Sequence, residues 1–286
     1  MAIYTDQMNS TIRLGIPIAI GTIRIVSLVP SQTELLHYLG LEEEVVGITK
    51  FCIHPKSWFD SKTRIGGTKS VDIEKVRTLE PDLIIGNKEE NTKEDIDALR
   101  EIAPVWMSDI STLDDAIEML QLLGEILNKK VEIDQLVFEI RSEFDALRKF
   151  SSTHPTLPKK KSNALKVNEG SPTAKLNGKT VLYFIWNEPP FLAGKDTFID
   201  AMLNACGLVN ATSVVRYPQA DPSIQPDFVF LSSEPFPFEE KHIEKFRDVY
   251  PTSKIILVDG EQFSWYGSRL KIAPKYFQSL LESLVN

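Results

Sequence analysis

The sequence has few cysteines and no long apolar run. Cys52 and Cys206 are the only cysteines among 286 residues, too few for a disulfide-stabilised framework or a CxxC metal site. No apolar stretch approaches the roughly 18 residues that a membrane-spanning helix requires. The net charge of −8 at pH 7 argues against nonspecific binding to nucleic acid or to an anionic lipid surface. These absences predict a protein with no membrane span and no nucleic-acid partner.

Two further kinds of signal are missing. Residues 1–8 lack the basic start, apolar core and small-residue cleavage site of a secretory signal, so the chain as written is expected to stay in the cytoplasm. The sequence also contains no GxGxxG, GxxxxGKS/T, HExxH or GxSxG motif. We therefore assign no catalytic residue and no metal ligand set, and we expect a protein that is not an enzyme and holds no covalent cofactor.

A long amphipathic helix is the strongest pattern that is present. Residues 129–150 contain no Gly or Pro, and a charged face alternates with an apolar stripe at three- and four-residue steps. The stripe consists of Ile133, Leu136, Val137, Ile140, Phe144 and Leu147. A helix of about 22 residues is roughly 33 Å long, enough to join two domains. The alternative is an ordinary surface helix of a single α/β domain.

Strands and helices alternate on both sides of this helix. Strands are predicted at residues 24–29, 45–49, 82–86 and 105–107, and again at 180–185, 228–231 and 255–258. The intervening segments have helical periodicity, which indicates parallel α/β sheets. We predict two Rossmann-like α/β lobes joined by one rigid helix, with a ligand cleft between them. The expected domains are an N-terminal lobe (1–128), the helix (129–150), a polar linker (151–178) and a C-terminal lobe (179–286).

Local signals add detail at the N-terminal end. Residues 3–6 and 11–19 are expected to form a hairpin. Ser31 is a candidate N-cap with Glu34 completing a capping box, and Gly40 is expected to end that helix.

A short internal repeat supports the two-lobe prediction. Pro81–Asp82 opens one buried strand, and Pro226–Asp227 opens another on the far side of the long helix. Each strand runs into a polar loop that contains glutamate. Because α/β sheets bind ligands at the carboxyl ends of their strands, these loops are expected to border the cleft.

The polar candidates for chemistry each have a plain alternative. His54 is the only histidine in a loop at a strand end; it is a candidate metal or axial ligand, but it has no spaced partner. Glu89 and Glu90 form either a general acid–base pair or charged decoration of a loop. The lysines at 159–161 form either an anion-binding patch or, in an acidic protein, a solvated loop.

Aromatic residues are concentrated in predicted loops. Six of them fall there: Phe51, Trp58, Trp186, Tyr217, Trp265 and Tyr266. A pocket with aromatic walls and a few polar anchors, here Gln32, Asn91 and Arg269, suits a large flat ligand. The alternative is that some rings only pack loops onto the lobes, which we expect for Trp58 and about half of the others. The remaining five rings, the three anchors and His54 are the predicted ligand-binding residues.

Several segments together resemble the solute-binding proteins of ABC importers for cobalamin and iron-siderophores, with the cobalamin-binding branch most similar. The resemblance is carried by residues 24–34 (RIVSLVPSQTE), 39–41, 45–48, 66–68 and 81–85, and it covers nearly the whole chain except 151–178. It implies two lobes on one rigid helix. It also implies that Phe51, Trp186 and the Tyr217–Pro218 pair occupy ligand-facing positions.

The resemblance also implies partners. The expected ligand is a small-molecule metal chelate, namely cobalamin, haem or a ferric siderophore, and the expected protein partner is an ABC permease docked through Glu74. It implies a periplasmic or cell-surface location and a monomer. The competing hypothesis is a cytosolic enzyme or a metal-chelate handling factor on the same scaffold.

Overall fold

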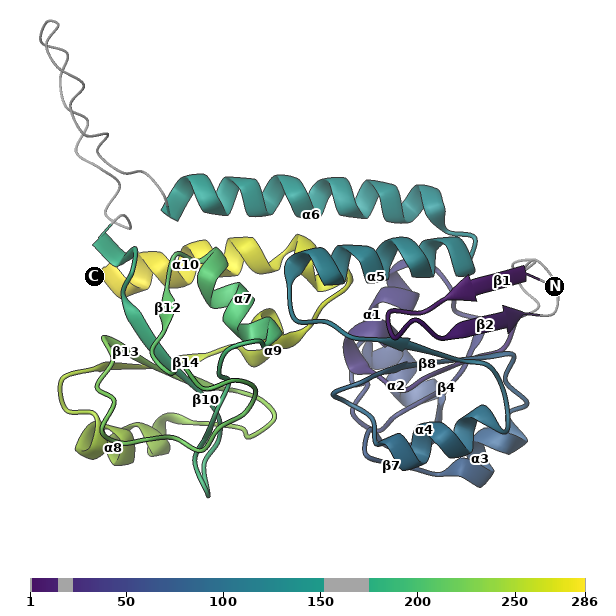
Figure 1. Ribbon diagram of the computed structural model, residues 1–286, viewed down its shortest axis with the longest axis horizontal. Coiled ribbons are helices and arrows are strands. Elements are labelled where there is room, and N and C mark those ends of the chain that lie inside the picture. Colours follow the sequence, from purple (N-terminus) through teal and green to yellow (C-terminus); the bar gives the residue numbers. More distant parts are fainter. Residues whose placement is uncertain (1, 15–22, 152–174, 286) are drawn as a thin grey trace, which may run out of the picture. The chain divides into compact units, whose positions relative to one another are not determined.

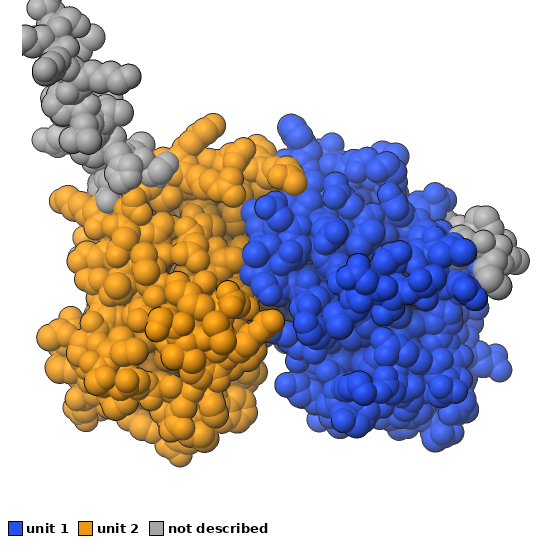
Figure 2. All heavy atoms as spheres, viewed as in Figure 1, with its two compact units in different colours: residues 1–139, 265–270 blue, residues 140–264, 271–286 orange. Residues whose placement is uncertain are grey.

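The computed structural model describes residues 2–14, 23–151 and 175–285 (Figure 1). The chain forms two compact units, which we describe separately (Figure 2). Unit 1 comprises residues 1–139 and 265–270, and unit 2 comprises residues 140–264 and 271–286. The end of the predicted strand 11–19, most of the predicted linker 151–178 and the lysines at 159–161 lie outside the described residues.

Unit 1 is built on a five-stranded parallel sheet that contains the four predicted strands and one short edge strand, β5, that was not predicted. The strand order is β5-β4-β3-β8-β9. The bounds are β3 (Ile25–Ser27), β4 (Val45–Ile48), β5 (Thr63–Arg64), β8 (Leu83–Asn87) and β9 (Val105–Ser108). Every residue of β8 and β9 is buried, which is typical of parallel strands covered on both faces.

Helices and two small hairpins complete unit 1. The helices are α1 (Pro30–Tyr38), α2 (Lys56–Ser61), α3 (Ile73–Thr78), α4 (Lys93–Arg100) and α5 (Leu113–Ile126). The hairpins are β1 (Ala2–Thr5) with β2 (Thr11–Leu14), and β6 (Gly66–Gly67) with β7 (Ser70–Val71). The side chains of Asp72, Thr92 and Thr112 cap α3, α4 and α5, so each helix begins where a backbone N–H finds an acceptor.

The predicted cap of α1 is wrong. The helix begins at Pro30, its N-cap is Val29, and no side chain caps it. Proline is favoured at the first helical position because its missing N–H would have no intrahelical partner there. Glu34 is therefore not part of a capping box. Gly40 does follow the end of the helix, with a φ of +70°, as predicted.

The long helix is present as α6 (Lys130–Ser151), within one residue of the predicted bounds. Ile133, Leu136, Ile140 and Leu147 are fully buried, so the predicted apolar stripe is its packed face. A Cβ on Gly124 of α5 would lie 2.9 Å from Ile133, so glycine at this position allows α5 and α6 to pack closely (Figure 1).

Unit 2 has its own mainly parallel sheet, in the order β11-β10-β13-β14 with β12 also paired to β10. The strands are β10 (Thr180–Trp186), β11 (Phe191–Leu192), β12 (Val209–Asn210), β13 (Phe228–Ser232) and β14 (Lys254–Val258). The helices are α7 (Phe198–Ala205), α8 (Glu240–Val249), α9 (Gly260–Ser264) and α10 (Ala273–Val285), with a 3₁₀ turn η2 (Ser268–Lys271).

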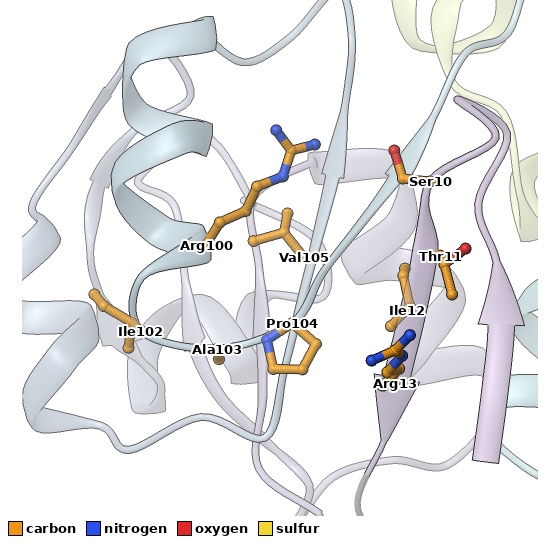
Figure 3. Close-up of a pocket in the computed structure, with 9 residues that line it drawn as sticks. All are labelled: Ser10, Thr11, Ile12, Arg13, Arg100, Ile102, Ala103, Pro104 and Val105. Atoms are coloured by element: carbon orange, nitrogen blue, oxygen red, sulfur yellow. The ribbon is translucent and has the colours of Figure 1, made fainter. Parts of the chain in front are cut away.

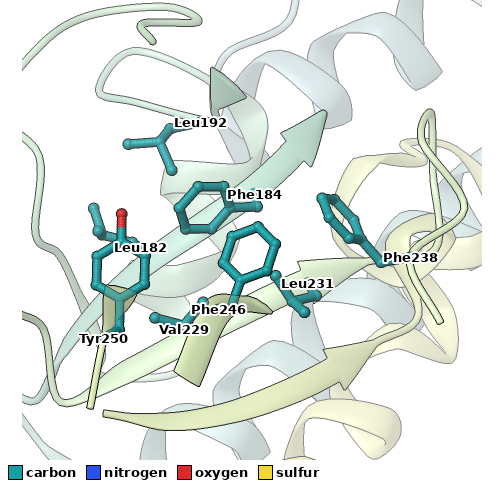
Figure 4. Close-up of a cluster of buried hydrophobic side chains, with 8 residues drawn as sticks. All are labelled: Leu182, Phe184, Leu192, Val229, Leu231, Phe238, Phe246 and Tyr250. Carbon is teal, nitrogen blue, oxygen red and sulfur yellow. The ribbon is translucent and has the colours of Figure 1, made fainter. Parts of the chain in front are cut away.

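An aromatic cluster fills the space between the unit 2 sheet and α8 (Figure 4). Phe184 of β10 lies 4.7 Å from Phe246 of α8 and 5.8 Å from Tyr250, measured between ring centroids. These edge and tilted contacts contribute beyond the burial of apolar area. The cluster therefore fixes α8 on the sheet and supports the loop that follows β10.

Two predicted loops are helical in the structure. Trp58 lies in α2, and residues 260–271 form α9 and η2 around a short connection. Both segments are short, and α2 has only six residues, so their helical periodicity is too brief to be recognised in the sequence.

Candidate functional site

The internal repeat has the same structural role in both units. In unit 1 the backbone N–H of Arg24 donates to Asp82 Oδ2 at 2.8 Å, at the start of β3 and β8. In unit 2 the N–H of Thr180 donates to Asp227 Oδ2, also at 2.8 Å, at the start of β10 and β13. Each aspartate thus aligns the amino ends of two neighbouring parallel strands. As a result, the carboxyl ends of these strands lie together at one edge of each sheet, where α/β folds bind ligands.

In unit 1 this carboxyl edge contains a buried network of amides and hydroxyls. Gln32 Nε2 donates to Ser108 Oγ at 2.6 Å, and Asn87 Nδ2 donates to the same oxygen at 2.9 Å. Gln32, Asn87 and Ser108 are all almost fully buried. Gln32 Oε1 has no hydrogen-bond partner among the described residues. Gln32, predicted as a ligand anchor, therefore uses its amide nitrogen inside the protein.

Asn91, the second predicted anchor, also holds the protein's own backbone. Its Oδ1 accepts from Asn87 N at 2.8 Å, and its Nδ2 donates to the carbonyl of Thr68 at 2.9 Å. The side chain is 7% exposed. Asn91 thus ties the loop after β8 to the turn between β6 and β7, and it shapes the edge from within.

Phe51 is an accessible aromatic residue of unit 1, in the loop after β4. It is 51% exposed, and the ammonium of Lys50 lies 5.1 Å from its ring centroid, a cation–π geometry. A Cβ on Gly67 would lie 3.3 Å from the Phe51 ring. The ring therefore rests against the β6–β7 turn and leaves its other surface open.

The acidic and thiol groups near this edge give no support for catalysis. The N–H groups of Glu89 and Glu90 donate to Asn87 Oδ1 at 2.8 and 3.2 Å, which fixes their loop. Desolvation raises the pKa of Glu90, against the opposing effect of Lys69. Burial likewise raises the pKa of Cys52, so its thiol stays protonated at neutral pH and is a poor nucleophile.

Trp265, Tyr266 and Arg269 lie in a different unit from the one predicted. The sequence placed them in the second lobe, opposite Phe51 and His54, but residues 265–270 belong to unit 1. Trp265 and Tyr266 are only 6% and 7% exposed. Arg269 donates from Nη2 to Glu34 Oε1 at 2.7 Å and from Nε to Oε2 at 3.0 Å. The ligand contacts of these residues stay a prediction, and the hydrogen bonds from Arg269 to Glu34 lie within unit 1.

In unit 2 the accessible aromatics lie at the end of β10 and in the segment that pairs with the chain around β11. Trp186 is 43% exposed; its Nε1 donates to the carbonyl of Glu188 at 3.2 Å, and its ring packs edge-on against Phe236 at 5.7 Å. Tyr217 is 41% exposed. Its chain neighbours pair with the β11 segment, since Gly194 N donates to Arg216 O at 2.7 Å and Leu192 N to Pro218 O at 2.9 Å. Both rings thus project from backbone that is held in place.

Trp58 packs as predicted. The side chain is fully buried, its ring makes an edge contact with His37 at 5.3 Å, and its Nε1 donates to Glu42. It is a core residue of unit 1.

Glu74, the predicted docking residue, is exposed on α3. Its side chain is 80% exposed, and the carboxylate lies 3.5 Å from Arg77 Nε one turn later. An exposed pair of this kind contributes little to stability, so Glu74 is available to a partner at small cost.

Two cavities lie away from the predicted residues. One, of about 560 Å³, lies in unit 1 between β2 and the α4–β9 connection, with Arg13 and Arg100 on opposite sides (Figure 3). The other, of about 330 Å³, lies in unit 2 beside Phe184, Phe246 and the Lys245–Glu188 ion pair. None of the predicted ligand-binding residues lines either cavity.

Within residues 2–14, 23–151 and 175–285 no group of three or more His, Cys, Asp or Glu side chains is arranged to hold a metal ion. In the same residues no helix is both long and apolar enough to span a membrane.

Two α/β units with polar or aromatic carboxyl edges, linked through one long helix, define the class of bilobed solute-binding proteins. A family model described as periplasmic binding protein matches residues 25–234. The chain belongs to the periplasmic binding protein family. Members of this family are substrate-binding transport proteins rather than enzymes.

Individual relatives agree with this assignment. The uncharacterized ABC transporter substrate-binding lipoprotein YvrC of Bacillus subtilis is 28% identical over 196 residues, which cover 66% of this chain and 55% of that relative. The vitamin B12-binding protein of Pectobacterium carotovorum is 22% identical over 91% of this chain and 89% of its own length. The periplasmic heme-binding protein RhuT from Roseiflexus sp. RS-1 has a similar fold, with a TM-score of 0.72, 20% identity and coverage of 93% and 100%.

Proposed function

We propose that this protein captures a planar metal chelate, of the corrinoid or porphyrin type, and delivers it to an ABC permease. The observation that carries the proposal is the distribution of exposed aromatic rings. Three of the five predicted ligand-facing rings, Phe51, Trp186 and Tyr217, are each 41–51% exposed, although large aromatic side chains normally gain stability from burial. Exposed rings of this kind offer a flat apolar ligand a surface to stack on, and the family supplies the transport role.

The three polar residues predicted as ligand anchors already form hydrogen bonds within the protein. Gln32, Asn91 and Arg269 are engaged with Ser108, Thr68 and Glu34. Affinity would therefore come mainly from stacking on exposed rings such as Phe51 and Trp186. Lys50, whose ammonium lies over Phe51, is a cation that the sequence analysis did not single out; it is placed to interact with a carboxylate or amide on the ligand rim. In the sequence, the position of Lys50 directly before the aromatic residue Phe51 is the signal that could have identified it as a candidate.

The proposal is tested by titrating the purified protein with cyanocobalamin, haemin and a ferric hydroxamate siderophore. Isothermal calorimetry is preferred to fluorescence alone, since coloured ligands quench tryptophans without binding specifically. We expect one of the first two to bind at one site per chain, with a negative heat-capacity change from apolar burial. If none of the three binds more tightly than about 100 μM, well below the affinity expected of a capture protein, the proposal fails.

The family also supports a proposal about where the protein acts. One relative is a lipoprotein and the matching family is periplasmic, and the expectation of a cytoplasmic protein is not supported. We propose that the chain acts in the periplasm or at the cell surface as a monomer, with Glu74 as its contact to the permease. The competing enzyme hypothesis has no support from the pKa of Cys52 or from the family.

A further inference from the structure

A six-residue segment from the C-terminal part of the chain completes unit 1. Residues 265–270 belong to unit 1, whereas the chain before and after them belongs to unit 2. We call these residues the 265–270 segment. Its two ring-bearing residues and Leu270 are buried, so the segment is part of the core of unit 1 and not a surface loop.

A charged pair fixes the segment to α1. The two hydrogen bonds from Arg269 to Glu34 are 2.7 and 3.0 Å long, and the two side chains are 10% and 23% exposed. This is the bidentate arrangement in which arginine and a carboxylate bind most strongly and with most directionality. Partial burial also protects the pair from screening by salt.

The backbone of the segment approaches α1 closely at a glycine. Gly267 has a φ of +116°, and a Cβ at this position would lie 3.2 Å from the carbonyl oxygen of Ser31 and 3.4 Å from Leu35. Both the conformation and the lack of space require glycine. The turn is therefore seated against the same helix that carries Glu34.

Arg269 also organises two rings. Its guanidinium lies 4.6 Å from the centroid of the Trp265 ring, and Trp265 packs edge-on against His54 with the centroids 5.5 Å apart. A continuous series of contacts thus runs from Glu34 through Arg269 and Trp265 to His54.

His54 belongs to the loop that carries the exposed ring of unit 1. In residues 51–55, the Phe51 loop, Cys52 is fully buried and its Sγ accepts from Thr33 Oγ1 at 3.1 Å. Cys52 N donates to Thr49 O at 3.1 Å. The loop is therefore anchored at Cys52 on one side and at His54, through Trp265, on the other.

We propose that Arg269 is a positioning residue for ligand binding: held by Glu34, it keeps Trp265 against His54 and so fixes the loop that presents Phe51. This inference rests on the proposed function, because Phe51 is proposed there to contact the ligand. Arg269 itself acts through Trp265 and His54 and does not touch the ligand.

The test compares Arg269→Met, Glu34→Gln, the milder Arg269→Lys and the reversed pair Glu34→Arg/Arg269→Glu. The control is Lys275→Met, which removes an exposed pair with Glu143 (3.4 Å, lysine side chain 70% exposed) on α10. Two readouts are needed, both taken well below the melting temperature of the least stable variant. One is the NMR contact between the His54 and Trp265 rings in ligand-free protein, and the other is the dissociation constant for the chelate that binds.

We expect Arg269→Met and Glu34→Gln to lose the ring contact and to weaken ligand binding roughly tenfold. Arg269→Lys, which keeps the charge without the planar fork, should fall in between, and the reversed pair should recover part of both losses. Lys275→Met should change neither. Should Arg269→Met fail to fold, Arg269→Lys and Glu34→Gln still decide the question.

Two results would overturn the inference: loss of the ring contact with unchanged affinity, or loss of affinity with the ring contact intact. Failure of the proposed function looks different, because then the wild-type protein binds none of the chelates. In that case hydrogen exchange in residues 51–55 decides the positioning role, and equal protection in the wild type and Arg269→Met contradicts it.

Discussion

The two units start their central strands alike and end them differently. Asp82 and Asp227 each accept a backbone N–H from the neighbouring strand at 2.8 Å. At the carboxyl ends, unit 1 has the buried amide–hydroxyl network around Ser108, whereas unit 2 has the exposed ring of Trp186 packed on Phe236. The amino ends thus carry the fold common to both units, and the carboxyl ends carry what distinguishes them.

The strands that pair with β3 in unit 1 and with β10 in unit 2 account for this difference between the carboxyl ends. In unit 1 the parallel β4 pairs with β3, and the register shift between Ile25 and Val26 lies near the amino end of β3. In unit 2, β12 pairs only with Thr180 and Val181, and the antiparallel β11 pairs with Phe184 and Trp186, with the register shift between these two residues at the carboxyl end of β10. The shift re-aims the chain at the end of β10, which places Trp186 on the surface.

The largest expected effect separates core rings from exposed rings. Trp58→Ala should lower the free energy of unfolding by about 3–5 kcal/mol, because a fully buried Trp leaves a large cavity. Trp265→Ala should also be costly, since this ring is 6% exposed. Thermal and urea unfolding measure both. A loss for Trp58→Ala no greater than that for Trp186→Ala would contradict the assignment of Trp58 to the core.

The second expected effect is a loss of ligand affinity without a loss of stability. Trp186→Ala and Phe51→Ala should each cost about 1–3 kcal/mol of binding free energy, five- to a hundred-fold in Kd, with little change in melting temperature. Calorimetry with the chelate that binds measures the first quantity and scanning fluorimetry the second. If only one of these two variants weakens binding, a single unit recognises the ligand and the comparison between the units becomes sharper.

A smaller effect, on the free energy of unfolding, tests the aspartate that aligns the strand starts in each unit. The hydrogen bond from Lys179, followed by that from Thr180 N, lowers the pKa of Asp227 below its usual value. A lowered folded-state pKa contributes stability above the unfolded-state pKa, and this contribution is lost as the pH falls through the folded-state pKa. Asp227→Asn should therefore cost about 1 kcal/mol at pH 7.

The difference from the wild type should shrink as the pH falls below about 4, the region of an ordinary aspartate pKa. Urea unfolding at pH 7, 5 and 3 measures it. Asp221→Asn is the comparison: the pKa of Asp221 is also lowered, but by hydrogen bonds from Ser223 only two residues away and not by a contact between strands. A pH-independent cost for Asp227→Asn would show that packing, and not the charge, is responsible.

The smallest expected effect on the ligand belongs to Glu74. Glu74→Lys removes only the exposed pair with Arg77, so both stability and ligand affinity should stay unchanged. If Glu74 pairs with a permease cation, the same variant should abolish transport or complex formation. Glu94→Lys, on α4 of the same unit, is a charge-matched control. Normal complex formation by Glu74→Lys would remove Glu74 from the docking surface.

The sequence was a good guide to local structure and a poor one to long-range polar contacts. The bounds of α6 and the central strands follow from residue periodicity, which each segment carries by itself. Glu34 and Arg269 are 235 residues apart, so neither position indicates its partner. Gln32 and Asn91 look the same in sequence whether they face a ligand or a neighbouring backbone carbonyl, and only the folded structure distinguishes the two.

The course of the chain through the 265–270 segment has a consequence for biosynthesis. Since unit 1 includes residues 265–270, it cannot reach its final form until nearly the whole chain has left the ribosome. The usual order, in which an N-terminal domain folds first during translation, would leave α1 without its Arg269 partner for most of synthesis. Until then the part of α1 against which Gly267 is seated has no covering segment, so unit 1 completes its core only at the end of synthesis.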